Sequence, residues 1–231
     1  MKTISHTDEA AKKIVKKFCE QVFWLRNVRH IYEELFENEQ SPILMKRTAP
    51  SFFADLNTIL HSYLLLEFAK ITDPAETREK ENFTVDNLIV SIDWPQDIRD
   101  KLTSLSEKTK GFRRHILGAR HKLLAHTDKE AFLADRTLGG FPEGEDEIFL
   151  KTLQEVCDIT HEACFGSIFG QMILTMPGDV INFKRALENA VAFNELLSES
   201  SGQEKTRLYS YLQKARHRPT STQGEVQKED S

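Results

Sequence analysis

The stretch from Pro95 to Leu124, PQDIRDKLTSLSEKTKGFRRHILGARHKLL, decides the fold. Its apolar residues recur in alternating steps of four and three, with Thr109 filling the single gap, at Ile98, Leu102, Leu105, Phe112, Ile116, Ala119 and Leu123. This spacing is typical of the seam of a helix that packs lengthwise on other helices. Since proline is tolerated in a first helical turn, we expect the helix to begin near Pro95.

Helical spacing recurs on both sides of this stretch. It predicts helices over residues 7–38, 50–72, 84–92, 146–175 and 179–197, with Gly166 and Gly170 inside the fourth of them. In the second, the periodic apolar positions are Phe52, Leu56, Ile59, Tyr63, Leu66 and Ala69. No segment alternates strictly between apolar and polar residues, so strands are not expected. The sequence predicts an all-α antiparallel bundle of about six helices over residues 1–200, and a flexible basic and polar tail over 201–231.

Composition places the chain among water-soluble proteins. It has 231 residues, 29% of them charged, and a net charge of -5, which argues against a protein that coats nucleic acid indiscriminately. No apolar run exceeds four residues, the length of Tyr63 to Leu66, which is too short to span a bilayer, and residues 1–13 do not resemble a signal or transit peptide. The three cysteines are odd in number and form no CxxC pair. We therefore expect a cytoplasmic protein without disulfides and without membrane contact.

One local stretch departs from this acidic average. Residues 108–122, KTKGFRRHILGARHK, hold six Lys or Arg and no acidic residue. Such an inversion of charge is what a site for a polyanion requires. It also fits a surface helix whose basic end favours the helix dipole, and the cluster by itself does not separate these readings.

Within this stretch, Arg120 is followed by the polar His121 and, after four more residues, by His126. This pattern resembles the motif of the HEPN superfamily. The ending LLAHTD at 123–128 and the run LEFAKITDPAETREKENFTVDNLI at 66–89 resemble its abortive-infection, AbiU-like branch. The resemblance implies a HEPN-like helical bundle, metal-independent cleavage of RNA, no cofactor, and a role as a toxin or abortive-infection effector with an antitoxin or regulatory partner.

The motif residues suit that chemistry. A histidine can take or give a proton near neutral pH, and an arginine can present paired donors to a phosphate. The resemblance implies that His126 transfers the proton and Arg120 clamps the phosphate, with a 2′,3′-cyclic phosphate as product. His121, Arg113 and Lys122 are expected to contact the RNA. Asp128 is expected either to support His126 or to end the helix.

Helix geometry adds a constraint on the motif. At about 100° per residue, Arg120 and His126 lie about 120° apart on one helix, so they flank the apolar seam. HEPN-like proteins bring two motifs together by dimerising. We therefore expect a two-fold homodimer with the seam of this helix near its axis.

Other candidate sites are weaker. Cys157, His161 and Cys164 share one helix face, but three ligands from one segment are fewer than a structural zinc site usually has, so we interpret the cysteines as core. His61 is interpreted as a bundle histidine rather than a site residue. No glycine-rich phosphate-binding pattern occurs. The alternative to a ribonuclease is a non-catalytic helical dimer that binds RNA, a nucleotide or a partner protein through the same basic stretch.

Overall fold

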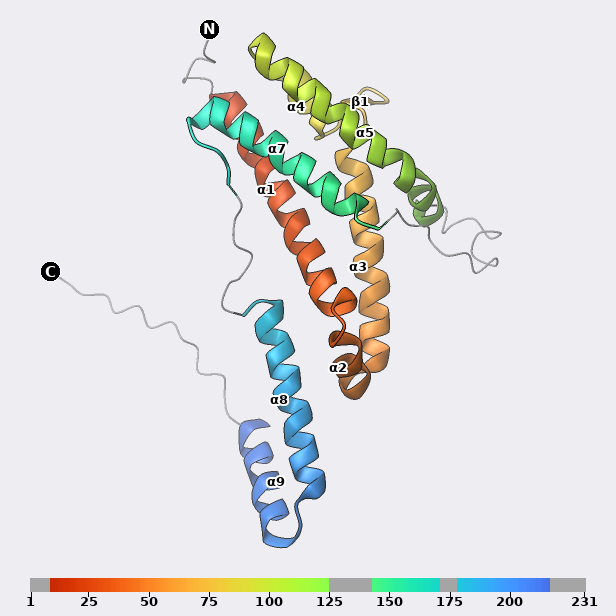
Figure 1. Ribbon diagram of the computed structural model, residues 1–231, viewed down its shortest axis with the longest axis vertical. Helices are drawn as coiled ribbons and strands as arrows, with labels where there is room; N and C mark the ends of the chain where they lie inside the picture. The colour runs from red at the N-terminus through yellow and green to blue at the C-terminus, as the bar shows by residue number, and fades with distance from the viewer. Residues whose placement is uncertain (1–8, 125–142, 171–177, 217–231) are drawn as a thin grey trace, which may run out of the picture.

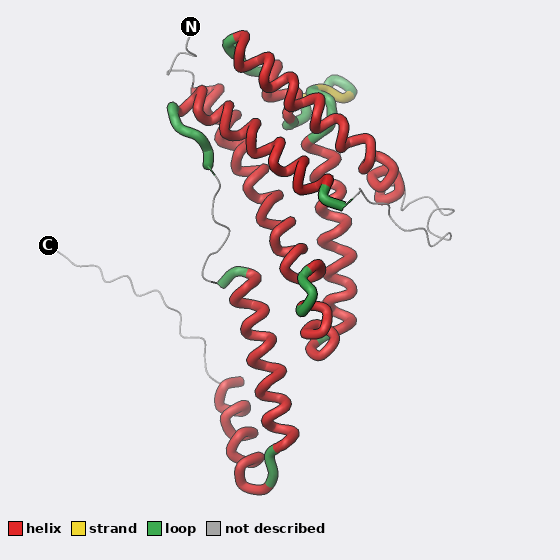
Figure 2. Tube along the Cα trace, in the orientation of Figure 1, coloured by secondary structure: helices red, strands yellow, loops and turns green. Residues whose placement is uncertain are grey.

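The described part of the protein is almost entirely helical, as the apolar spacing predicts. The computed structural model describes residues 9–124, 143–170 and 178–216 (Figures 1 and 2). Its helices are α1 (Glu9–Tyr32), which continues into a π-helical turn η1 (Glu33–Glu37), α2 (Ser41–Thr48), α3 (Pro50–Ile71), α4 (Val85–Val90), α5 (Gln96–Leu124), α7 (Glu145–Phe165), α8 (Val180–Glu199) and α9 (Gly202–Arg216). The all-α prediction is confirmed. None of the described helices has the length and apolar character needed to cross a bilayer.

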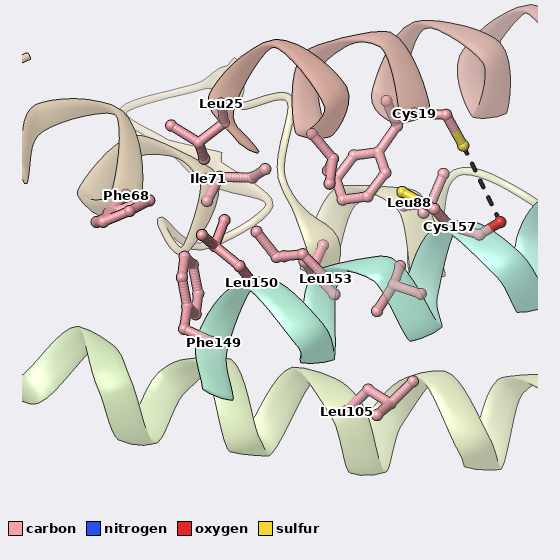
Figure 3. Packing of buried hydrophobic residues seen from close by; sticks show 14 of the residues in the cluster. Cys19, Leu25, Phe68, Ile71, Leu88, Leu105, Phe149, Leu150, Leu153 and Cys157 are labelled. Atoms are coloured by element: carbon pink, nitrogen blue, oxygen red, sulfur yellow. Dashed lines mark hydrogen bonds between the residues drawn. The ribbon is translucent and has the colours of Figure 1, made fainter. Parts of the chain in front are cut away.

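Four long helices enclose the core. Helix α7 packs on α1 and on α5, and α3 packs on both of the same helices. Phe68, Phe112 and Phe149, from three different helices, meet at its centre with ring centroids 4.3 to 5.7 Å apart. Figure 3 shows Phe68 and Phe149 within this cluster. The core therefore joins segments far apart in the sequence.

The seam of α5 is part of this core. Leu102, Leu105, Phe112 and Ile116 are all buried, and Thr109 fills the gap by donating its hydroxyl to the Ser106 carbonyl at 2.8 Å. The predicted helix and its predicted buried face are confirmed over these residues. Its start is close to the expected one, because the carbonyl of Pro95 accepts from Ile98 and Arg99.

The connection from α3 to α5, residues 72–95, contains the short helix α4. It contains a hairpin of two-residue strands, β1 (Glu76–Thr77) and β2 (Lys80–Glu81), although no strand was expected. Thr84 caps α4 by accepting from the backbone of Asn87, as expected of a threonine before a helix. The indole of Trp94 then donates to the Leu88 carbonyl at 2.9 Å. These contacts fix α4 and the turn that leads from it into α5.

Several boundaries differ from the predicted ones. Helix α2 occupies 41–48, where a break was expected, because Pro42 lies in its first turn, where proline does not interrupt a helix. Helix α7 ends at Phe165, ten residues early, because Gly166 takes a left-handed conformation with φ of 76°. The prediction that Gly166 and Gly170 lie inside a helix is wrong, since both follow the end of α7.

The chain ends in a helical hairpin. Asp179 caps α8 by accepting from the backbone of Ile181 and Asn182. Helix α9 then runs antiparallel to α8, and both extend beyond the main body (Figure 1). A flexible tail was predicted from residue 201, yet residues 202–216 form helix α9, in which Leu208 and Leu212 are half-buried.

Candidate functional site

Helix α5 carries the basic stretch along the outside of the core. Phe112 and Ile116 point into the protein, whereas Lys108, Arg114 and His115 are exposed. Over residues 108–116 the helix is therefore amphipathic, since the side that faces the core is apolar and the exposed side is cationic. That arrangement offers positive charge to a polyanion.

Arg113, an expected RNA contact, has a partner inside the chain. Its Nη2 donates to Oδ1 of Asp73 at 2.9 Å, just beyond the end of α3, and both side chains are largely buried. The Nε of Arg113 is buried and has no hydrogen-bond partner among the described residues. The structure thus places Arg113 as a tie between α3 and α5, and an RNA contact would have to use its remaining exposed atoms.

A second tie joins α4 to α5. Ser106 donates its hydroxyl to Asp86 in a short hydrogen bond, and Lys110 lies 3.3 Å from the other oxygen of Asp86. Lys110 also pairs with Glu107 at 3.0 Å. The hydrogen bond to Glu107 raises the pKa of Lys110, and Asp86 adds to this increase against the opposing effect of burial. Like Arg113, Lys110 is a cation with a partner inside the protein.

The motif itself begins in the last turns of α5. Arg120, His121 and Lys122 have helical backbone, since α5 extends to Leu124, but their side chains lie outside the described part. His126 and Asp128 lie outside the described residues altogether. The proton-transfer role of His126 and the support from Asp128 therefore remain predictions, as do the substrate contacts of His121 and Lys122.

The expected dimer meets a constraint here. The described part of the α5 seam, from Leu102 to Ile116, is buried against the chain's own helices. It cannot lie on a two-fold axis at the same time. A homodimer remains a prediction, and its axis cannot pass through this described part of the seam.

The cysteine and histidine group of α7 belongs to the core. Cys157 and Cys164 are buried, and the thiol of Cys19 lies 4.0 Å from the Cys157 carbonyl. Burial raises the pKa of the Cys157 thiol well above its ordinary value, which keeps it neutral. His161 stacks on Phe165, and its Nδ1 lies 2.6 Å from the Ser167 carbonyl. The core interpretation of these cysteines is confirmed, and the described residues contain no group of side chains arranged to hold a metal ion.

A polar cavity lies where α1, α3 and the start of α7 meet. Its volume is about 450 Å³, and His61, Tyr32, Glu37 and Asp146 are among its lining residues. Arg29 also lines it, with Nε 2.5 Å from Oδ2 of Asp146 and Nη2 2.8 Å from Oε2 of Glu37. His61 lines this cavity, and its ring centroid lies 6.0 Å from that of Tyr32. It therefore packs within the bundle, as interpreted from the sequence, and also faces the cavity.

The charged groups around this cavity set the protonation states of Arg29 and Tyr32. Burial lowers the pKa of Arg29, but its hydrogen bond and attraction to Asp146 outweigh this and raise it, so the side chain stays ionised. Burial, with the nearby Glu37, raises the pKa of Tyr32, so its hydroxyl stays neutral. A sequence signal for the cavity exists, because Arg29 continues the apolar spacing of Leu25 and Tyr32 on α1, but its distant partner Asp146 has none.

One of three comparisons with known proteins identifies a family, and that family is consistent with the all-α fold. No curated protein and no solved structure matches the sequence. A family model, HEPN_AbiU2, described as AbiU2, matches residues 8–174. The matched range contains α1 to α7 and the whole of the Arg120 to His126 motif, while α8 and α9 lie beyond it. Because the match covers more than two thirds of the sequence, the chain belongs to the AbiU2 family of HEPN domains.

Proposed function

We propose that this chain is a HEPN-type endoribonuclease that cleaves RNA without a metal ion. The observation that carries the proposal is the Arg120 to His126 motif at HEPN spacing inside the range matched by the family. Helix α5 supports it, because this helix presents the exposed cations Lys108 and Arg114 on the side away from the core. Such positive charge would attract a phosphate backbone to this end of the chain.

In this proposal the RNA supplies its own nucleophile. The 2′-oxygen of a ribose attacks the neighbouring phosphorus, and the bond from phosphorus to the 5′-oxygen breaks. His126 takes up the 2′-hydroxyl proton, and an imidazolium returns a proton to the departing 5′-oxygen. Arg120 stabilises the charge that gathers on the phosphate oxygens. The products are a 2′,3′-cyclic phosphate and a 5′-hydroxyl.

Cleavage of an end-labelled RNA in the presence of EDTA tests this proposal. His126→Ala should lower the rate at least about 100-fold, the usual worth of a general acid or base. His115→Ala is the matched control, because His115 is an exposed histidine of the same helix outside the motif, and it should change the rate by less than about threefold. The 3′ ends should resist phosphatase until acid opens the cyclic phosphate.

Two outcomes would contradict the proposal. One is full activity in His126→Ala, and the other is loss of activity in EDTA. Salt-sensitive RNA binding with no cleavage under any condition would instead favour a non-catalytic protein that holds RNA, a nucleotide or a partner protein.

The biological role we propose is abortive infection, in keeping with the AbiU2 family. A toxin that degrades cytoplasmic RNA would arrest growth when expressed, unless an antitoxin or regulatory partner holds it inactive. Arg120→Ala and His126→Ala should each restore growth to cells that express the chain. Growth arrest that persists in both variants would contradict this role.

A further inference from the structure

Helix α9 carries a second basic stretch of the chain. Residues 205–216, KTRLYSYLQKAR, hold four Lys or Arg, no acidic residue and two of the four tyrosines of the sequence. The family match ends at residue 174, so this stretch lies outside the part of the chain that contains the Arg120 to His126 motif. Like the stretch on α5, it reverses the sign of charge within an acidic chain, which is what a site for a polyanion requires.

The cations and tyrosines of α9 are arranged in rows along the helix. Arg207, Tyr211 and Lys214 recur at steps of four and three residues, so they lie in one row, and all three are exposed. We call these three residues the α9 row. The half-buried Leu208 and Leu212 lie about 110° away around the helix. Because α9 lies beside α8 and apart from the other described helices (Figure 1), the row is open to solvent.

The side chains of the α9 row interact with one another. Nη2 of Arg207 lies 3.5 Å from the hydroxyl of Tyr211, and its guanidinium carbon lies 5.9 Å from the centre of the Tyr211 ring. The hydrogen bond from Arg207 lowers the pKa of Tyr211, and the charges of Arg207 and Lys214 lower it further. Elsewhere Lys12 and Lys151 each pair with a glutamate three or four residues away. Among the described residues, neither cation of the α9 row has such an acidic partner.

An exposed aromatic ring between two cations is suited to single-stranded nucleic acid. A base can stack on the ring, and the cations on either side can contact the phosphates before and after that base. Tyr211 is 52% exposed, so its ring is accessible to a base. The seven-residue step from Arg207 to Lys214 spans about 10 Å, which corresponds to about three stacked nucleotides at 3.4 Å each. The row therefore matches a short segment of a strand.

A membrane surface matches α9 less well. A helix that lies on a bilayer inserts large apolar side chains and keeps its cations in the headgroup region. In α9 the leucines are half-buried, whereas the fully exposed side chains of the row are a tyrosine and two cations. The exposed side thus offers stacking and positive charge rather than an aliphatic surface, which favours RNA over lipid.

We propose that the α9 row binds single-stranded RNA, with a base stacked on Tyr211 and with Arg207 and Lys214 on the neighbouring phosphates. The inference rests on the proposed function, since it takes RNA as the ligand, and it assigns that RNA a second contact outside the motif. Attachment of one strand at two places raises the effective concentration of RNA at the motif. The α9 row is thus a substrate-holding surface and takes no part in the bond cleavage.

Fluorescence anisotropy of the full chain with a labelled 2′-O-methyl oligouridine of about 12 nucleotides tests the binding. This RNA has no 2′-hydroxyl to attack, so it stays intact whether or not the chain is a ribonuclease. Tyr211→Ala should weaken binding at least about fivefold, because one stacked base is lost. Tyr211→Phe keeps the ring and should bind within about twofold of the wild type.

Tyr209→Ala is the matched control for Tyr211→Ala. Tyr209 is 49% exposed on the same helix, but it lies about 160° around the helix from Tyr211 and outside the row. This variant should change the affinity by less than about twofold, and circular dichroism should show the same helix content in both variants. Equal losses in Tyr209→Ala and Tyr211→Ala, or no loss in Tyr211→Ala, would overturn the inference.

Salt dependence tests the contacts to phosphate. Replacing both Arg207 and Lys214 by glutamine should make the plot of log affinity against log salt concentration shallower by about 1.4, since each phosphate contact on a single strand contributes about 0.7. An unchanged slope would overturn the role of the two cations. Binding of the chain to anionic lipid vesicles in place of the RNA would overturn the inference in favour of a membrane contact. Cleavage of unmodified RNA is measured separately, so the proposed ribonuclease activity and the α9 row can fail independently.

Discussion

Asp73 and Arg113 join the end of α3 to α5, the helix in which the motif begins. Because their side chains are largely buried, removing the charge of Asp73 leaves a guanidinium with one fewer partner in a poorly hydrated place. We expect Asp73→Asn to lower the free energy of unfolding by about 1 to 2 kcal/mol, after allowance for solvent around the arginine. Urea titration followed by circular dichroism measures this change.

Asp93→Asn is the matched control for that prediction. Asp93 also pairs with an arginine, Arg99, at 3.5 Å, but its carboxylate is fully exposed. Exposed pairs contribute little because water screens them, so this variant should have nearly the stability of the wild type. If both variants lost equal stability, the Asp73 to Arg113 pair would not be a tie of the kind described.

The Cys157 thiol makes the stability of the fold decrease as pH rises into the alkaline range. Burial raises the pKa of its thiol, so the native state keeps the proton while the unfolded chain releases it above about pH 9. The stability from this group is complete at lower pH and is lost as pH rises, by at most about 1.4 kcal/mol for each pH unit. We expect Cys157→Ala to be less stable at pH 7 but to show a shallower decline between pH 9 and 10. Chemical denaturation at several pH values measures both, and an unchanged slope would contradict the assignment.

Two glycines test why α5 continues while α7 stops. Gly111 lies inside α5, where an added Cβ would meet only the tip of Arg114 at 3.9 Å, so Gly111→Ala should stabilise the protein by about 0.5 to 1 kcal/mol. Gly166 ends α7 at φ of 76°, where a side chain is strained, so Gly166→Ala should destabilise it by about 1 kcal/mol. Thermal and urea denaturation measure both, and changes of the same sign would contradict this account.

The extents of α5, α7 and α3 show how far the sequence predicts individual helices. Apolar spacing predicted α5 and its buried side well, because one periodic stripe occupies one face. It predicted the extent of α7 poorly, since helical spacing does not show that Gly166 adopts a left-handed conformation. On α3 the apolar residues form two stripes, so periodicity identified the helix without showing that Ile59 is exposed.

For the candidate site, the sequence located what is local and missed what is distant. The motif at Arg120 to His126 and the basic stretch are readable because their residues are neighbours on one helix. The internal partner of Arg113 is 40 residues away, and the partner of Arg29 in the polar cavity is 117 residues away. Such pairings depend on how the helices pack, so they follow only from the folded chain.

The whole molecule divides into a body and a projecting hairpin. The family match ends at residue 174, before α8, and the main core draws mostly on α1, α3, α4, α5 and α7. Helix α8 contributes Val180 and Leu187 to a smaller cluster that also includes Met45. Lys184 adds an ion pair to Glu34 at 2.8 Å. The body therefore has the core of an independent domain, and the hairpin is attached to one end of it.

A chain that ends at residue 177 should consequently still fold. Its free energy of unfolding should be lower than that of the full chain by about 2 to 3 kcal/mol, because Val180 and Leu187 leave the small cluster while the main core keeps its contacts. Leu187→Asp in the full chain should reproduce most of that loss, since it detaches α8 without shortening the chain. Differential scanning calorimetry of both proteins should show one cooperative transition at a lowered temperature. A truncated chain that melts without a transition would show that α8 and α9 belong to the same folding unit as the body.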